Sequence, residues 1–252
     1  MSSTSDECHF RLNKISNNTQ AGLLVFNGGV PVVSACTFSA NEVAGVVCQS
    51  EAAPRLSSCT VSDNAGCGML FDAHACGELR QCDVHGNTLA GVAAKNHASP
   101  TLLDCLIRDG KDAGLLVYGG GAPVLQGCEI LRNALAGVAV SGAGAPALTR
   151  CALRDNASGI SVVDGGHGVY TDCTLAGNGV VQLEVVNCQG NDIPEVSLPC
   201  PFRPCALVRC HACALTGGCT GANLRDFGRR GVRGGDPRRW LMLAARLRNQ
   251  GP

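Results

Sequence analysis

Three polar residues, Glu51, His74 and His97, follow one another at intervals of 23 residues. A carboxylate beside two imidazoles can bind a divalent metal ion or tune a general base. A structural repeat of the same length would bring the three side chains together on one edge of the molecule. The alternative is a solvated turn at which any polar residue serves, since glycine or alanine stands at the equivalent place elsewhere.

A second group of possible metal ligands lies near the C-terminus. Cys210 and Cys213 form a C-x-x-C pair, and Cys200 and Cys205 precede it. Structural zinc sites use four such ligands, usually in two well-spaced pairs. Zinc bound by these four cysteines is therefore the one cofactor that the sequence suggests. A loose, Arg-rich tail without metal is the alternative.

The elements that must position such residues follow from an internal repeat. Asparagine stands five residues after most of the repeating cysteines, and glycine stands four residues after the asparagine. The cysteines recur every 23 residues and once after 22, at Cys36, Cys59, Cys82, Cys105, Cys128, Cys151 and Cys173. Apolar residues alternate with others after each glycine, which is typical of a short strand.

Three short strands and three bends per repeat predict one coil of a right-handed parallel β-helix, because stacked coils pair their backbones. We predict an all-β solenoid of about eight coils over residues 8–194. Residues 195–252 are expected to form an irregular tail rich in Cys and Arg. In the coils, cysteine is small enough for a crowded bend, so we expect internal, reduced thiols. Asparagine can form a hydrogen-bonded ladder from coil to coil.

The second residue after each repeat glycine should face outward, and it is mostly apolar. A long apolar sheet face on a soluble protein indicates a partner-binding surface. The alternative is that the tail, or a missing domain, packs over it. The residues of this predicted stripe are Leu24, Val47, Leu70 and Leu116, with Phe26 and Tyr118 beside them.

Enzymes that act on acidic polysaccharides need paired carboxyls, or a basic residue beside a general base. The apolar stripe contains no acid, and His167-Gly168 alone resembles part of a polygalacturonase motif. We therefore predict no catalytic residue. Acidic and basic residues balance at 20 each, which favours neither nucleic acid nor a membrane surface as partner. The N-terminus lacks the residue order of a signal peptide, so we expect a cytoplasmic or nuclear protein.

The stretch AGVAAKNHASPTLLDCLIRDGKDAGLLVYGGGAPVLQGCEILRNALAGVAV resembles the β-helix repeats of F-box only proteins, and the resemblance covers roughly residues 8–192. It implies a substrate-recruiting module of a cullin-type ubiquitin ligase, with a protein substrate and ligase components as partners. A zinc-finger module follows the β-helix in some members. This sequence departs from the family in having no F-box segment before the first coil, and Cys where relatives often have Asn.

Residues and resemblance together predict a non-catalytic protein-binding β-helix module. A polysaccharide-active enzyme of the pectate-lyase-like type is the alternative. An open first coil would also fit a fragment of a longer protein, because its strand edges lack partners.

Overall fold

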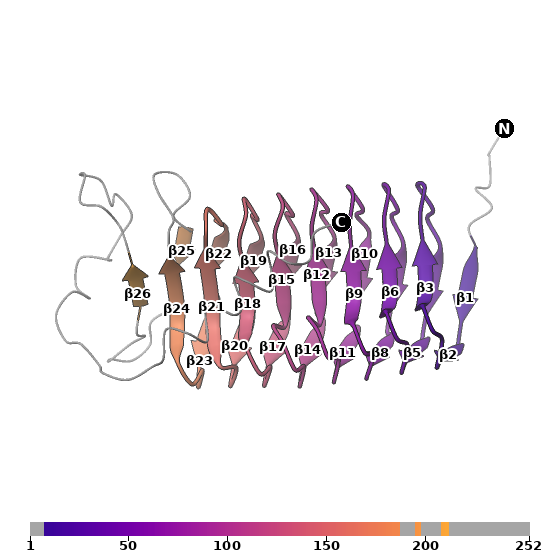
Figure 1. The fold of residues 1–252 in the computed structure, drawn as a ribbon, viewed down its shortest axis with the longest axis horizontal. Coiled ribbons are helices and arrows are strands. Elements are labelled where there is room, and N and C mark those ends of the chain that lie inside the picture. Colours follow the sequence, from indigo (N-terminus) through magenta and orange to yellow (C-terminus); the bar gives the residue numbers. More distant parts are fainter. Residues whose placement is uncertain (1–7, 187–194, 198–207, 212–252) are drawn as a thin grey trace. The chain divides into compact units, whose positions relative to one another are not determined.

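The computed structural model describes residues 8–186, 195–197 and 208–211, all of them within a compact unit formed by residues 1–217. Residues 218–252 lie outside the described residues. The described part is a parallel β-helix of about eight coils, each with three short strands (Figure 1). It contains no helix that could cross a membrane. The fold predicted from the repeat is confirmed.

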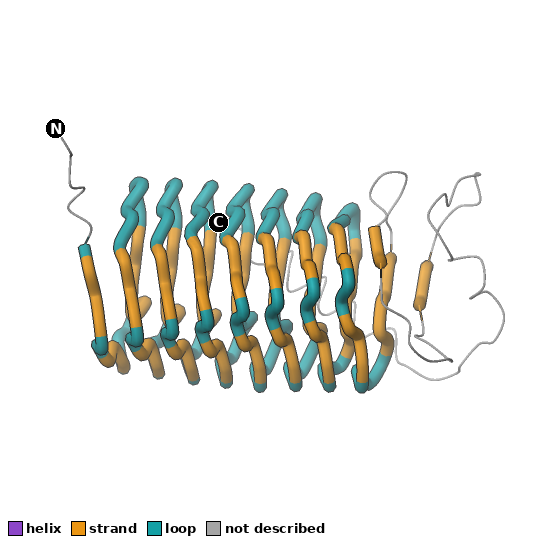
Figure 2. Tube along the Cα trace, turned by 180° about the vertical axis from the view of Figure 1, so that it is seen from behind, coloured by secondary structure: helices purple, strands orange, loops and turns teal. Residues whose placement is uncertain are grey.

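Each coil contributes one strand to each of three parallel sheets, and the loops form rows at the corners between the sheets (Figure 2). Sheet A consists of β1 (His9–Arg11), β4 (Val32–Ser34), β7 (Arg55–Ser57), β10 (Glu78–Arg80), β13 (Thr101–Leu103), β16 (Val124–Gln126), β19 (Ala147–Thr149), β22 (Val169–Thr171) and β25 (Glu195–Ser197). Sheet B consists of β2 (Lys14–Ser16), β5 (Thr37–Ser39), β8 (Thr60–Ser62), β11 (Asp83–His85), β14 (Leu106–Arg108), β17 (Glu129–Leu131), β20 (Ala152–Arg154) and β23 (Thr174–Ala176).

Sheet C contains the longest strands and carries the residues of interest below. It consists of β3 (Ala21–Val25), β6 (Ala44–Cys48), β9 (Cys67–Phe71), β12 (Val92–Ala94), β15 (Leu115–Val117), β18 (Ala136–Val140), β21 (Ser158–Val163), β24 (Val181–Val186) and β26 (Val208–His211). Because β25 pairs with β22 and β26 pairs with β24, strand pairing continues past residue 194.

The strands stack in strict register. Val84 of β11 pairs with Val61 of β8 on one side and with Ile107 of β14 on the other. Equivalent side chains therefore lie about 4.8 Å apart along the axis, the spacing between neighbouring strands. Every repeated sequence position becomes a straight column of side chains.

The interior is close-packed at these columns. Met69 and Phe71 of β9 and Val61 of β8 point inward, and none of the three has exposed surface. A Cβ atom added to Gly45 would come within 2.3 Å of Val61 Cγ1. Only glycine fits there, which explains why it recurs at the start of most strands of sheet C.

The cysteine column lies inside the helix and is unbridged, as predicted; each of its seven thiols is buried. Most donate to backbone carbonyls of their own and the preceding coil. Cys105 Sγ, for example, lies 3.4 Å from the Leu103 carbonyl oxygen and 3.6 Å from that of Leu79. Packing and weak hydrogen bonding account for this column.

The asparagines form the predicted ladder. Asn41 Nδ2 donates to Asn64 Oδ1 at 3.0 Å, and Asn64 Nδ2 donates to Asn87 Oδ1 at 2.9 Å. The backbone N–H of Asn64 donates to the same Asn87 oxygen at 3.1 Å. Gly110 occupies the next position, so the side-chain ladder stops at Asn87 and resumes at Asn133, whose Oδ1 accepts the Gly110 N–H at 3.1 Å.

Candidate functional site

A column of polar residues runs along the outer side of sheet C, immediately after its strands. Gln49 follows β6, Asp72 follows β9, Lys95 follows β12 and Tyr118 follows β15. Alternation along the strand puts this column on the same outward side as Leu70, two residues further on. Successive coils therefore place Asp72, Lys95 and Tyr118 next to one another.

Lys95 is held in place by both of its neighbours in the column. Its Nζ lies 3.2 Å from Asp72 Oδ2, and the Tyr118 side chain lies near it on the other side. Asn96 Nδ2 donates to the other Asp72 oxygen at 2.8 Å. The side chains of Lys95 and Asp72 are only 21% and 22% exposed. A partly desolvated ammonium group is thus fixed in position with one side still open to solvent.

The Tyr118 phenol is partly buried beside this ammonium group. Burial raises the pKa of Tyr118 above its ordinary value, and nearby Lys95 opposes the rise without cancelling it. The phenol therefore stays protonated in neutral solution, where it can act as a proton donor.

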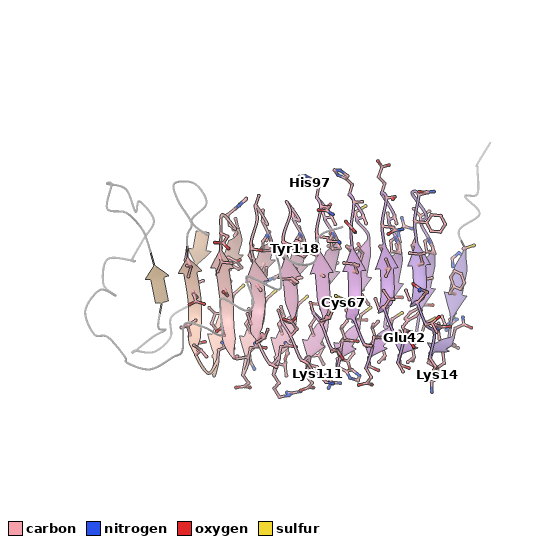
Figure 3. All side chains as sticks on the ribbon, in the orientation of Figure 1. Lys14, Glu42, Cys67, His97, Lys111 and Tyr118 are labelled. Carbon is pink, nitrogen blue, oxygen red and sulfur yellow. The ribbon has the colours of Figure 1, made fainter. Side chains whose placement is uncertain are left out.

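The turns that follow the polar column carry Glu51, His74 and His97, all exposed. Each turn has two successive residues at positive φ, for example Asn96 at 49° and His97 at 64°. The rings of His74 and His97 stack with their centroids 5.3 Å apart and their planes 12° apart. Figure 3 shows His97 at the opposite edge of the molecule from Lys14 and Lys111. The sequence correctly predicted that this column lies on one edge.

The geometry does not support a metal ion in this column. Across the part of the chain that the structure describes, no three His, Cys, Asp or Glu side chains form a group that could hold one. The two imidazoles lie face to face, so their nitrogens do not converge on a common point. Acid–base chemistry is the alternative that fits exposed imidazoles.

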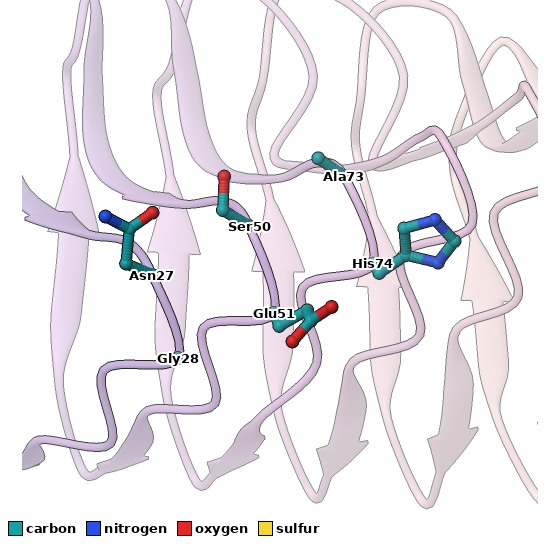
Figure 4. Close-up of a pocket in the computed structure, with 6 residues that line it drawn as sticks. All are labelled: Asn27, Gly28, Ser50, Glu51, Ala73 and His74. Atoms are coloured by element: carbon teal, nitrogen blue, oxygen red, sulfur yellow. The ribbon is translucent and has the colours of Figure 1, made fainter.

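An open depression of about 440 Å³ lies on the same edge, over the first three coils of sheet C. Figure 4 shows the Glu51 carboxylate and the His74 imidazole projecting from neighbouring turns. The residues that line the depression are Asn27, Gly28, Ser50, Glu51, Ala73 and His74.

Together these groups suit proton transfer at a carbon next to a carboxylate. Such a reaction needs a cation to stabilise the negative charge that develops on the carboxylate, and groups that remove and return a proton. Lys95 is the cation, Tyr118 is a donor, and His97 is a candidate base two residues after Lys95. Asp72 and Lys95 stand at the fourth position after the repeat glycine, not at the second position that defined the predicted stripe, and they were not among the predicted site residues. Tyr118, which was among those residues, belongs to the same fourth-position column and was the available signal.

The predicted partner-binding stripe is not continuously exposed. Leu24 and Phe26 are 50% and 52% exposed, whereas Val47 and Leu116 are buried at 8% and 7%. Leu70 and Tyr118 are partly buried. Partner binding stays a prediction, and only the end of the stripe at Leu24 and Phe26 offers free apolar surface.

The predicted zinc ligands cannot be placed as a site. Cys200, Cys205 and Cys213 lie outside the described residues, and of Cys210 only the backbone in β26 is described. Zinc binding by the tail stays a prediction.

Comparison with known proteins identifies the fold family. A family model described as a right handed beta helix region matches residues 1–99 and 44–195. The sequence matches none of the curated proteins.

Several solved structures are similar to this chain. The A-module of the Azotobacter vinelandii mannuronan C-5 epimerase AlgE6 is 17% identical, with a TM-score of 0.65 over 78% of this chain and 59% of that one. The AlgE4 A-module from the same organism is 15% identical, with a TM-score of 0.63 over 76% of this chain and 58% of that one. The periplasmic alginate epimerase AlgG is 15% identical, with a TM-score of 0.59 over 71% of this chain and 48% of that one. The chain spans about half of each structure, and at these identities the likeness shows the fold alone.

These findings correct three predictions. The expectation of a non-catalytic module in a ubiquitin-ligase pathway, and with it the expectation that the chain is no enzyme, is wrong: the similar structures are epimerases. The link to F-box only proteins is not supported. The physical reason for the error is that the outer face was judged from its apolar column alone, which hid Asp72 and Lys95.

The predicted cytoplasmic or nuclear location is also wrong against these comparisons, which include a periplasmic enzyme. That prediction was drawn from the residue order of the N-terminus, together with the reduced thiols expected in the coils. The structure buries the thiol column in the core, where packing explains the cysteines whatever the redox state of the compartment.

Proposed function

The chain belongs to the family of right-handed β-helix proteins, and on that premise we propose that it is an enzyme acting on an acidic polysaccharide. The proposed reaction removes the proton from the sugar carbon that carries the carboxylate. The observation that supports it most is the Asp72–Lys95–Tyr118 cluster, which fixes one ammonium group beside a protonated phenol. Alginate and mannuronan, the substrates named for the similar structures, are polymers of this class.

Lys95 binds the carboxylate of the reacting sugar. When the proton leaves the neighbouring carbon, its electron pair moves toward the carboxylate, whose charge increases. A preorganised ammonium group stabilises this charge, and more strongly in a partly desolvated position than in water. Asp72 keeps Lys95 aimed outward and balances its charge before substrate binds.

His97 and Tyr118 divide the proton transfers. His97 accepts the proton, because imidazole is the side chain most used as a general base. Tyr118 donates its phenolic proton to the same carbon from the other side, which inverts the configuration. If Tyr118 instead protonates the glycosidic oxygen on the adjacent carbon, that C–O bond breaks, a C=C bond forms between the two carbons and the chain is cleaved. Both outcomes share the first proton removal.

The test is therefore exchange of that proton. Mannuronan incubated with the protein in D₂O should gain deuterium at the carbon that bears the carboxylate, as measured by NMR. Lys95→Gln should slow this exchange by about 10²–10³-fold, as removal of a single charge-stabilising group does in other enzymes. Lys111→Gln is the matched control, because Lys111 is exposed on the opposite edge.

Absence of exchange with mannuronan, pectate and other polyuronates would refute the proposal. Equal effects of Lys95→Gln and Lys111→Gln would refute the assignment of the site. Ultraviolet absorbance of unsaturated chain ends would distinguish cleavage from inversion.

A further inference from the structure

We infer that the depression beside Glu51 is a second sugar subsite, and that it accepts a unit that turns its hydroxyl groups toward the protein and rejects one that turns its carboxylate toward the protein. The inference rests on the proposed function, since it assigns the subsite to the same polysaccharide. The depression gathers an amide from Asn27, a hydroxyl from Ser50, a carboxylate from Glu51 and an imidazole from His74 (Figure 4). All four are hydrogen-bonding groups suited to a polyol.

The depression lies next to the proposed reaction site along the axis of the helix. Glu51 and His97 occupy the same position two coils apart, which corresponds to about 10 Å. A single sugar held by its carboxylate at Lys95 does not extend over that distance, but the neighbouring part of a polymer does. His74 links the two places, because it lines the depression and stacks against His97.

The charges of the two places are opposite. Lys95 presents a cation to the reacting unit, whereas Glu51 presents an exposed carboxylate to the unit in the depression. Sugar hydroxyls donate hydrogen bonds to a carboxylate, but a second carboxylate is repelled by it. Specificity is commonly built from such a repulsive element together with the attractive ones. Glu51 thus selects the orientation of the unit two coils away from the reaction.

The wall of the depression is formed before substrate arrives. The Gly28 N–H donates to the Ser50 carbonyl at 2.9 Å, and the Glu51 N–H donates to the Ala73 carbonyl at 3.1 Å. The His74 N–H continues the row to Asn96 at 3.0 Å. Turns tied to one another in this way hold the lining side chains at fixed spacing, as expected of a preformed ligand site.

Calorimetric binding to two oligosaccharides tests the inference without relying on turnover. One is a mannuronate oligosaccharide, and the other is the same compound with its carboxyls reduced to hydroxymethyl groups. The measured quantity is the ratio of Kd for the charged compound to Kd for the reduced one. Glu51→Lys should lower this ratio about tenfold or more relative to the unaltered protein, and Glu51→Gln should give an intermediate value.

Glu42→Lys is the matched control: it makes the same change of charge at an exposed glutamate on the opposite edge (Figure 3), and it should leave the ratio unchanged. A ratio that is the same in all four proteins, or that shifts equally in Glu42→Lys, overturns the inference, as does a lack of binding to either compound. Glu51-dependent binding without deuterium exchange would refute the proposed reaction alone. Exchange with Glu51-independent binding would refute the subsite alone.

Discussion

Asn64 and Asn96 carry the same side chain in two different regions of the molecule. Asn64 is fully buried, accepts from Asn41 and donates to Asn87, as its equivalents do in most coils. Asn96 is exposed on the outer edge and orients a single carboxylate, that of Asp72. The interior repeats one type of residue along the axis, whereas the polar column on the outer side of sheet C carries a different residue in each coil, such as Asp72, Lys95 and Tyr118. The repeated buried residues stabilise the fold, and the polar residues of the edge that do not repeat form the proposed site.

The largest contrast is expected between two residues that are adjacent in the chain. Phe71 is fully buried, so Phe71→Ala should lower the free energy of unfolding by about 3–5 kcal/mol through lost burial and a cavity. Asp72→Asn should leave unfolding in urea nearly unchanged and slow deuterium exchange into mannuronan, because Lys95 loses its anchoring charge. If Asp72→Asn destabilised the protein as much as Phe71→Ala, the division between interior and edge would fail.

The two asparagines give the next contrast. Asn64→Ala leaves the amide and N–H of Asn41 without their acceptor, and should cost about 1–3 kcal/mol of stability per buried group left unpaired. Asn96→Gly keeps the positive φ easily, since glycine stands at this position in the next coil, and should change stability by less than about 0.5 kcal/mol. Thermal unfolding of both variants measures the difference. Equal midpoints would contradict a structural role for the ladder.

The interior could be predicted from the sequence and the edge only in part, for a physical reason. Cys105 or Asn133 can be recognised because their neighbours at 23-residue intervals are of the same type, so the column is visible without coordinates. Asp72, Lys95 and Tyr118 differ from one another, and no periodicity marks them as a group. Their column becomes visible only when the strand ends of sheet C are known. The stacking of His74 on His97 was accessible in advance because identical residues again occupy successive coils.

Thiol reactivity should separate the same two environments. Cys8 is exposed, whereas Cys82 is buried. In the native protein, Cys82 should therefore be alkylated at least about a hundredfold more slowly than Cys8. Cys67 should also react slowly, because burial raises its pKa from about 9 to about 11. The neutral thiol is favoured in the folded state, so its contribution to stability is complete below pH 9 and is lost as the pH rises toward 11. Mass spectrometry of a timed labelling series measures these rates; equally fast labelling of Cys8 and Cys82 would refute the internal column.

The smallest effect is expected at an ion pair on the surface. Arg132 Nε donates to Asp109 Oδ1 at 2.7 Å, and Arg132 followed by Arg108 lowers the pKa of Asp109 to about 2. The stabilisation of the folded state by the ionised Asp109 is complete above the ordinary carboxyl pKa and is lost as the pH falls through about 2. Since the pair is solvent-exposed, Asp109→Asn should remove less than about 1 kcal/mol at neutral pH. Acid unfolding curves of the unaltered protein and of Asp109→Asn should differ only slightly at low pH. A large difference would show that residues of the edge also stabilise the fold.

Gly110 interrupts the asparagine ladder between two coils of special interest. In a stack where each coil touches only its neighbours, stability is approximately a sum of coil and interface contributions. The interface without an amide link joins the coil of β12 to the coil of β15, and these are the strands that Lys95 and Tyr118 follow. This interface therefore lacks the side-chain hydrogen bond that other interfaces of the ladder have, so we expect local opening of the stack to cost least there, beside Lys95 and Tyr118. Hydrogen exchange would register this interface as a local minimum of protection along an otherwise uniform core.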